Sequence, residues 1–187
     1  ATADVPVSFA REVVPVLTKA GCNQGACHGA ALGRGGFRLS LRSFDPTFDH
    51  AQIIQSAEGR RVVLPDPDRS TLLLKATLAL EHAGGERFAV GSREYHLIRQ
   101  WLADGAPEPS AKDPTVTRLE VLPTARVMAP GEQQQLVVRA FWSDGSVEDV
   151  TAAAQLESLN DGVAAVGPSG LVTAKDRGET HVMVRFG

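Results

Sequence analysis

The sequence predicts a multidomain chain in which an all-α domain is followed by an all-β sandwich. Apolar residues recur at helical spacing in the first part of the chain and at strand spacing in the second. Between these parts, residues 105–114 hold three prolines and a glycine with no apolar period, which is typical of a short, stiff linker. We therefore expect domains over residues 1–107 and 116–187, joined by a linker over residues 108–115.

Polar capping residues mark where four helices should begin in the first domain. Ser8 and Ser92 each precede an apolar stripe at helical spacing, and Pro15 should bend the first helix. Asp45 and Asp66 each precede a proline at the first helical position. We therefore expect helices over residues 8–20, 46–57, 67–79 and 92–103.

Short apolar or alternating segments after the linker predict strands. The predicted strands cover residues 117–121, 135–141, 163–166, 171–174 and 181–186. Asp144 and Gly145 form a pair that is typical of a tight hairpin turn. Strands of this length and spacing favour a two-sheet sandwich of about 70 residues.

Composition and charge argue against two classes of partner. The 187-residue chain has a formal net charge of -3 and a sequence pI near 6.0, so it offers no general positive field to nucleic acid or an anionic membrane. No apolar run approaches the roughly 18 residues that a membrane-spanning helix needs. We expect a soluble chain from which any export signal has been removed.

A short glycine-rich segment carries the most distinctive chemistry. Cys22 and Cys27 are separated by four residues, and His28 follows directly. Two thiols can add to the two vinyl groups of haem while the adjoining imidazole lies under the iron. Because the usual spacer has only two residues, this loop must bulge, and Gly25 and Ala26 are small enough to allow it.

Two other interpretations of these three residues stay open. The cysteines can form a local disulfide in an exported protein. A zinc site is the other alternative, although adjacent Cys27 and His28 cannot easily bind one ion and the sequence has no second cysteine pair. We expect covalent attachment of one haem c, with His28 as the proximal iron ligand.

The first region resembles the planctomycete-type cytochrome c domain over about residues 6–107. Besides the Cys-x4-Cys-His motif, the resemblance rests on Phe9–Pro15, Phe37–Leu41, Asp66–Ser70, His82–Gly85 and Tyr95–Pro107. It implies an exported, periplasmic or extracellular chain with haem c, a class I cytochrome c-like fold, and membership of a larger multidomain protein.

The second region resembles a bacterial immunoglobulin-like domain of group 2 over about residues 116–187. The resemblance rests on Phe141–Ser146, Asp149–Thr151 and Gly170–Ala174. We expect an immunoglobulin-like sandwich that acts as a spacer or adhesive module, with a polysaccharide or a cell surface as a possible contact. The acidic residues Asp144, Glu148 and Asp149 are assigned to the turn and the solvent-facing surface and not to a calcium site.

Histidine is the expected sixth ligand of the iron. The two methionines, Met128 and Met183, lie outside the first region, so a methionine of that region cannot be the ligand. The resemblance places the axial side chain in the loop before the last helix, where His82 lies. His50 is the second choice, His96 is expected to face solvent, and an open sixth position is a further alternative. We expect bis-histidine haem with a reduction potential below that of histidine–methionine haem.

Two further sets of contacts are expected around the haem. Its propionates need cationic or polar partners, and the candidates lie in loops at Arg34, Arg38, Arg60 and Arg61. The second ring nitrogen of the proximal histidine should donate to a backbone carbonyl, with a residue near Pro15 as the candidate, and this would fix its tautomer.

Electron transfer is the function that these expectations favour. One covalent haem c would exchange electrons with a redox partner protein or with further domains of the same chain. Enzymatic activity stays open, with electron transfer favoured over catalysis. The alternatives are a haem-based sensor or peroxidase-like domain with an open sixth site, and a surface or carbohydrate-binding module without haem.

Overall fold

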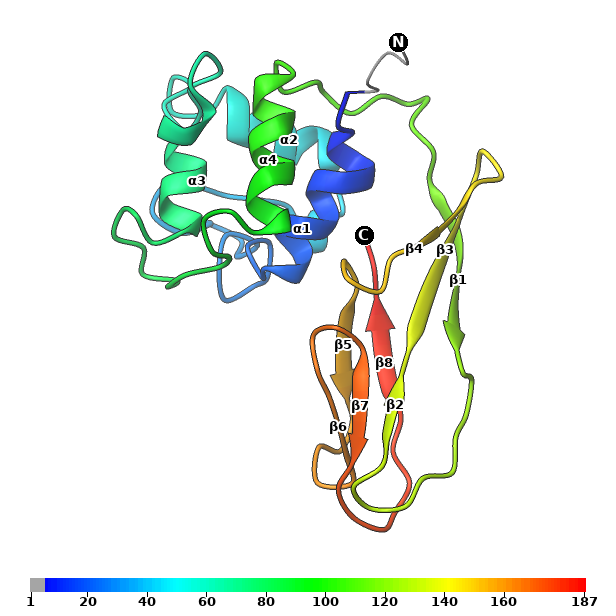
Figure 1. Cartoon of the computed structure of the whole chain (residues 1–187). Coiled ribbons are helices and arrows are strands. Elements are labelled where there is room, and N and C mark those ends of the chain that lie inside the picture. Colours follow the sequence, from blue (N-terminus) through cyan, green and yellow to red (C-terminus); the bar gives the residue numbers. More distant parts are fainter. Residues whose placement is uncertain (1–5) are drawn as a thin grey trace. The chain divides into compact units, whose positions relative to one another are not determined.

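The computed structural model describes residues 6–187, and the chain divides into two compact units (Figure 1). The first unit ends at Asp113, and the second covers Pro114–Phe186. This boundary falls inside the segment that the sequence predicts to be a linker. Within the described residues, no helix combines the length and the apolar character needed to cross a membrane.

Short helices form the frame of the first unit. The helical elements are η1 (Phe9–Val13), α1 (Val14–Lys19), η2 (Leu41–Ser43), α2 (Pro46–Ile54), η3 (Pro67–Arg69), α3 (Thr71–Ala76) and α4 (Arg93–Ala103). η1 is a π-helical turn, and η2 and η3 are 3-10 turns. The side chains of Ser8, Asp45 and Ser92 each accept a backbone N–H at the start of a helix, so these three predicted caps are confirmed.

Backbone conformations make the helices shorter than predicted. Ala57 and Glu58 have φ angles of 56° and 60°, in the left-handed region that ends a helix, and α2 already ends at Ile54. Leu78 has a φ angle of 58° and limits α3 in the same way. Pro15 lacks an N–H and crowds the carbonyl four residues before it, and the preceding turn widens into η1.

The predicted fold class, an all-α class I cytochrome c-like domain joined to an all-β immunoglobulin-like sandwich, is wrong. Helix accounts for only 24% of the chain and strand for 20%, in antiparallel sheets. In the first unit, residues 20–40, 55–66 and 77–92 contain no α-helix. Glycines at positive φ recur in these segments, at Gly21, Gly33, Gly35, Gly36, Gly59, Gly85 and Gly91. Because this conformation cannot continue a helix, irregular loops separate the helices.

The strands of the second unit form three small antiparallel sheets instead of the two expected. They are β1 (Val116–Leu122), β2 (Gln133–Gln135), β3 (Val137–Trp142), β4 (Val147–Asp149), β5 (Gln155–Ser158), β6 (Ala164–Val166), β7 (Leu171–Ala174) and β8 (Val182–Arg185). The sheets have the strand orders β1-β3-β4, β2-β7-β6 and β5-β8. The strand predicted over 135–141 divides at Leu136, whose N–H donates to the carbonyl of Gly170 at 2.8 Å. β2 and β3 therefore belong to different sheets.

The hairpin predicted at Asp144 and Gly145 is confirmed. β3 and β4 pair antiparallel on either side of this turn, and the N–H of Trp142 donates to the carbonyl of Ser146 at 2.9 Å. Gly145 has a φ angle of 84°, which a residue with a side chain rarely adopts. The glycine thus sets the geometry of the turn.

An aromatic cluster fixes the helices of the first unit against one another. Phe9 of η1 and Trp101 of α4 are fully buried, and their ring centres lie 5.1 Å apart. Nε1 of Trp101 donates to the carbonyl of Pro107 at 3.1 Å. His50 of α2 packs edge-on against Phe9, with ring centres 5.3 Å apart. α4 and α2 are thereby held to the start of the chain.

Asp68 ties η3 to α4 at the surface. Nε of Arg99 donates to both of its carboxylate oxygens, at 2.8 and 3.0 Å, and the hydroxyl of Tyr95 also donates to it. The hydrogen bond from Arg99, followed by that from Tyr95, lowers the pKa of Asp68. Because η3 leads directly into α3, this contact also helps to position α3.

Asp68→Asn should lower the stability of the first unit in a pH-dependent way. The pKa of Asp68 is lower in the folded chain than in the unfolded chain, so its contribution is present above the ordinary value of about 3.9 and is lost as pH falls through the folded value. Urea unfolding at pH 7 should show a small loss, since the pair is solvent-screened, and the loss should shrink at pH 3.

Asp66→Asn is the control, because Asp66 makes no capping hydrogen bond. An equal loss for Asp68→Asn at both pH values would show that the charge of Asp68 does not stabilise the fold.

Candidate functional site

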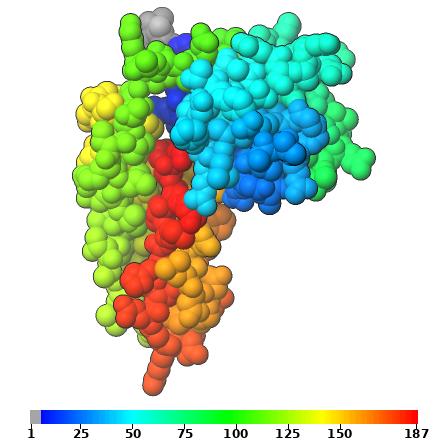
Figure 2. All heavy atoms as spheres, turned by 180° about the vertical axis from the view of Figure 1, so that it is seen from behind, coloured from blue at the N-terminus to red at the C-terminus, as the bar shows by residue number. Residues whose placement is uncertain are grey.

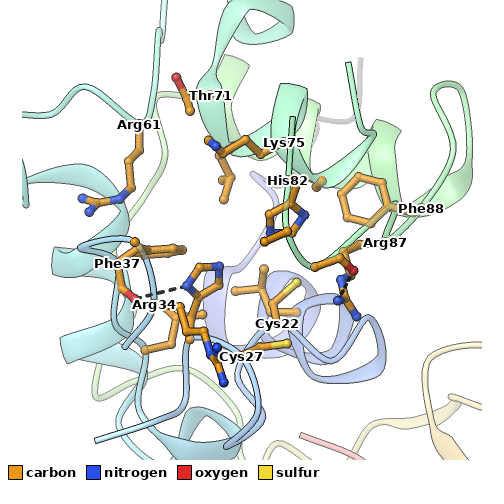
Figure 3. Close-up of a pocket in the computed structure, with 18 of the residues that line it drawn as sticks. Cys22, Cys27, Arg34, Phe37, Arg61, Thr71, Lys75, His82, Arg87 and Phe88 are labelled. Carbon is orange, nitrogen blue, oxygen red and sulfur yellow. Dashed lines mark hydrogen bonds between the residues drawn. The ribbon is translucent and has the colours of Figure 1, made fainter. Parts of the chain in front are cut away.

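A cavity of about 430 Å³ lies in the first unit (Figure 3). Leu17, Leu39 and Ile98 are buried in the core and also form part of its largely apolar wall. The other lining residues are Cys22, Ala26, Cys27, His28, Arg34, Gly35, Phe37, Arg61, Thr71, Leu72, Lys75, Ala76, His82, Ala83, Gly84, Arg87 and Phe88. Cofactor and small-molecule sites have volumes of roughly 300–1,000 Å³, so this cavity has the size of a ligand site.

Cys22 and Cys27 both line the cavity as free thiols. Figure 3 shows their sulfur atoms on the side of the cavity opposite Arg61 and Thr71. The spacer between the cysteines folds into a compact turn, because the N–H of His28 donates to the carbonyl of Cys22 at 2.9 Å. This turn brings both thiols and the following imidazole to one cavity.

Asn23 anchors this turn from inside the fold. Its side chain is 0% exposed, and Nδ2 donates to the hydroxyl of Thr18 at 2.8 Å and to that of Ser43 at 2.9 Å. The carbonyl of Asn23 accepts the N–H of Arg42 at 3.0 Å. A Cβ atom at Gly29 would lie 2.0 Å from that carbonyl oxygen, so only glycine fits there. The turn is thus fixed to both α1 and η2.

Asp49 extends the buried network from Asn23 to α2. Its two carboxylate oxygens accept the N–H of Ser40 at 2.5 Å and the hydroxyl of Ser40 at 3.0 Å. Burial raises the pKa of Asp49, and hydrogen bonds from Ser40 and Ser43 oppose that rise. We call residues 22–28 the cysteine turn. Because Ser43 also contacts Asn23, α2 supports this turn through a chain of hydrogen bonds.

His28 and His82 approach each other in the cavity from two distant segments of the chain. Their ring centres lie 6.2 Å apart, and their planes differ by 8°. An imidazole nitrogen lies roughly 2 Å from a bound transition metal and the ring centre about 1 Å farther, so two imidazoles on opposite sides of one ion have centres roughly 6 Å apart. The observed separation therefore suits two axial ligands of one metal ion.

In both imidazoles, Nδ1 is the nitrogen that makes a hydrogen bond. Nδ1 of His28 lies 3.1 Å from the carbonyl oxygen of Phe37, and Nδ1 of His82 lies 2.9 Å from that of Gly85. Since a carbonyl oxygen only accepts, each Nδ1 carries the hydrogen, and Nε2 keeps the lone pair that binds a metal. A carbonyl partner for His28 was predicted, but it comes from Phe37 and not from the region of Pro15.

Burial sets the charge of two groups in the cavity. It lowers the pKa of His28, the hydrogen bond to Phe37 opposes this effect, and the neighbouring His82 lowers the pKa further. Neutral imidazole is the form that binds a metal ion. Burial also raises the pKa of Cys22 to about 11, so this group is an uncharged thiol at neutral pH.

Two of the four arginines expected to bind the haem propionates line the cavity. Arg34 and Arg61 line it, whereas Arg38 and Arg60 do not. The Arg38 guanidinium instead lies 5.1 Å from the ring centre of Phe48, and Nε of Arg60 donates to the carbonyl of Ala57 in the turn after α2. These two arginines are turned to other contacts on the surface of the unit.

Lys75 and Arg87 are cavity residues that the sequence did not reveal. Nζ of Lys75 donates to the carbonyl of Glu81 at 2.9 Å, and Arg87 donates to the carbonyls of Ala20 and Gly84. Lys75 shares the cavity-facing side of α3 with other lining residues, and Arg87 follows His82 in the same loop. A basic residue on an apolar helix face was the only signal for Lys75.

The polar side of the cavity is cationic. Arg34, Arg61, Lys75 and Arg87 line it, and its lining includes no aspartate or glutamate. None of the four forms an ion pair with a carboxylate within residues 6–187. Guanidinium and ammonium groups bind carboxylates and phosphates strongly, so the cavity suits a largely apolar ligand that carries anionic groups.

The other two histidines of the first unit lie away from the cavity. His50, the second choice for the sixth ligand, is buried, and its Nε2 donates to the carbonyl of Ala106 at 2.9 Å. It packs between Phe9 and Trp101 in the core. His96 is exposed on α4. The structure therefore brings only His82, among the three candidates, near His28.

The residues of the cavity fit haem. Within the described residues, no group of three or more His, Cys, Asp or Glu side chains is placed to hold a metal ion. His28 and His82 would supply two ligands to an iron, and a porphyrin would supply the others. The apolar wall suits the porphyrin, the cations suit its two propionates, and the two thiols suit its two vinyl groups.

No protein-family model and no curated protein sequence matches this chain. The resemblances to a cytochrome c domain and to an immunoglobulin-like domain therefore stay predictions.

Asn23→Ala should destabilise the first unit by about 1–3 kcal/mol, because it removes the buried hydrogen bonds to the hydroxyls of Thr18 and Ser43. Gln24→Ala is the matched control, since Gln24 is exposed in the same turn and its loss should cost less than about 0.5 kcal/mol. Urea unfolding of both variants measures the difference. Equal stability of the two variants would show that Asn23 does not anchor the turn.

Proposed function

We propose that the first unit carries one covalent haem c and serves in electron transfer. The observation that carries this proposal is the pair His28 and His82, whose parallel rings lie 6.2 Å apart with both Nδ1 atoms hydrogen-bonded to carbonyls. Cys22 and Cys27 open into the same cavity. Four residues with suitable chemistry thus meet at one place.

The two cysteines would form thioether links. Each sulfur forms a bond to one carbon of a vinyl group while the thiol hydrogen goes to the other carbon, so the addition needs no oxidant. Because the turn between the cysteines is fixed by Asn23, both sulfurs are held on one side of the cavity. Haem would then lie between the two imidazoles, with its propionates toward the opposite side.

Haem supplies one-electron exchange between ferrous and ferric iron. His28 and His82 would hold the iron in both oxidation states, so the transfer would need little rearrangement. A ligand pair of this kind favours electron transfer over substrate activation, which needs an open position. Without a thioether ligand, the potential should lie below that of histidine–methionine haem.

The cations of the cavity would neutralise the propionates. Figure 3 shows Arg61 opposite the two sulfur atoms, where the propionate edge would lie. Its guanidinium is held by the carbonyls of Gln52, Ser56 and Gly36, at 3.1, 2.8 and 2.7 Å. This fixed position favours Arg61 as a propionate partner over a mobile surface arginine.

Haem c is attached outside the cytoplasm, so the proposal includes export to the periplasm or the cell exterior. The electron partner would be another protein or further domains of the same chain. The second unit would act as a spacer or adhesive module, with a polysaccharide or a cell surface as its contact.

His82→Ala should convert a low-spin spectrum into a high-spin one. Loss of the imidazole leaves the iron with five ligands, and the reduced variant should then bind carbon monoxide at once. His96→Ala is the control, because His96 is exposed on α4, and it should keep the low-spin spectrum. Absorption spectra of both haem-loaded variants make the comparison.

A low-spin spectrum in His82→Ala would contradict the assignment of His82. Immediate carbon monoxide binding by the reduced wild-type protein would favour a sensor or peroxidase-like function instead. Absence of a Soret band from the exported protein would contradict the haem proposal as a whole.

The oxidised protein should have a rhombic low-spin electron paramagnetic resonance spectrum with three resolved g values. Parallel imidazole planes separate the energies of the iron orbitals that interact with the two rings, whereas perpendicular planes leave them nearly equal. The rings of His28 and His82 differ by only 8°. A single, strongly anisotropic large-g signal would indicate perpendicular rings and contradict this geometry.

A further inference from the structure

The residues around the cysteine turn have a charge opposite to that of the whole chain. Residues 13–44 include Lys19, Arg34, Arg38 and Arg42 but no aspartate or glutamate, whereas the chain has a formal net charge of -3. Of the carboxylates that border this segment, Glu12 accepts the N–H of Ser8, Asp45 caps α2 and Asp49 is buried. Positive charge is therefore concentrated on one part of the first unit.

Residues 34–42 run directly along the cysteine turn. The N–H of Leu39 donates to the carbonyl of His28 at 2.8 Å, and the N–H of Arg42 donates to that of Asn23 at 3.0 Å. The Leu41 side chain lies 3.9 Å from the position of a Cβ atom on Gly25. In Figure 2, the chain around residue 25 and the chain around residue 45 form neighbouring parts of the visible surface.

This region is also apolar and open to solvent. Leu41 is 55% exposed and Phe44 is 87% exposed. Residues 24–26 of the turn are exposed, and Ala26 also lines the cavity. Ala26 has a small side chain, so the group attached at Cys27 would approach the protein surface closely at this point.

The arginines here have no carboxylate partner. No ion pair joins Arg34, Arg38 or Arg42 to an acidic side chain within the part of the chain that the structure describes. We define the loop surface as residues 24–26 with Arg38, Leu41, Arg42 and Phe44. Its apolar centre and its cations without carboxylate partners would be complementary to a protein surface that carries carboxylates around an apolar contact.

We infer that the loop surface is the docking site of an acidic redox protein. The inference rests on the proposed haem function and adds the place and the partner. One electron would pass between the bound iron and the cofactor of the partner at the edge near Ala26, with no proton or group transfer. Attraction between opposite charges would speed association despite the negative net charge of the chain.

The experiment compares two charge-reversed double variants of the haem-loaded chain. Arg38→Glu/Arg42→Glu changes the loop surface without touching the cavity lining. Arg126→Glu/Arg177→Glu makes the same change of total charge at two exposed arginines of the second unit. Plastocyanin, an acidic copper protein, is the kinetic probe, and it takes one electron as Cu(II) becomes Cu(I).

Oxidation of the reduced wild-type protein by plastocyanin should slow as salt is added, because salt screens an attraction. At low salt, Arg38→Glu/Arg42→Glu should slow this reaction by at least about tenfold, and the control variant should react like the wild type. Equal rates for the two variants, or a rate that rises with salt, would overturn the inference.

The redox-inert trianion hexacyanochromate(III) gives a second readout that needs no electron transfer. Its paramagnetism should broaden amide signals of residues 24–26 and 34–44 in the reduced protein, and Arg38→Glu/Arg42→Glu should remove this effect. Broadening elsewhere alone would also overturn the inference. A Soret band in every sample separates these outcomes from failure of the haem proposal, which would show as a chain without that band.

Discussion

The hydrogen bond from Nδ1 of His28 to the carbonyl of Phe37 is the contact on which the site depends. It fixes the tautomer and restrains the imidazole, so Nε2 keeps its lone pair in a ring whose centre lies 6.2 Å from that of His82. The backbone of His28 is held as well, by Cys22 on one side and Leu39 on the other. Rotation of this ring would separate the two histidines and leave two thiols beside an apolar cavity.

Basic side chains of the first unit lie in two places, inside the cavity and on the surface. Inside the cavity, Arg34, Arg61, Lys75 and Arg87 match an anionic ligand, and no carboxylate competes with it. Outside, Arg38 and Arg42 form a cationic border beside the cysteine turn, although the chain is acidic overall. The same segment would thus link the proposed ligand binding to the proposed partner recognition, because it contacts the cavity on one side and solvent on the other.

Neighbouring residues in the sequence predicted where helices begin better than where they end or how strands pair. Three helix caps were evident from the sequence, but Asp66 makes no capping hydrogen bond and α3 begins only at Thr71. Left-handed backbone at Ala57 and Leu78 leaves no compositional trace, so helix lengths were overestimated. The sheets depend on distant contacts such as Leu136 with Gly170. For the same reason, adjacent thiols and imidazole marked the site, whereas Lys75 joined it only through the packing of α3.

Mass spectrometry of the exported protein tests the central claim most directly. The haem account predicts an intact mass that is larger by one haem, and a proteolytic fragment spanning Cys22–His28 that keeps this added mass after denaturation. A fragment without haem, in which the two sulfur atoms are free or joined to each other, would contradict the account.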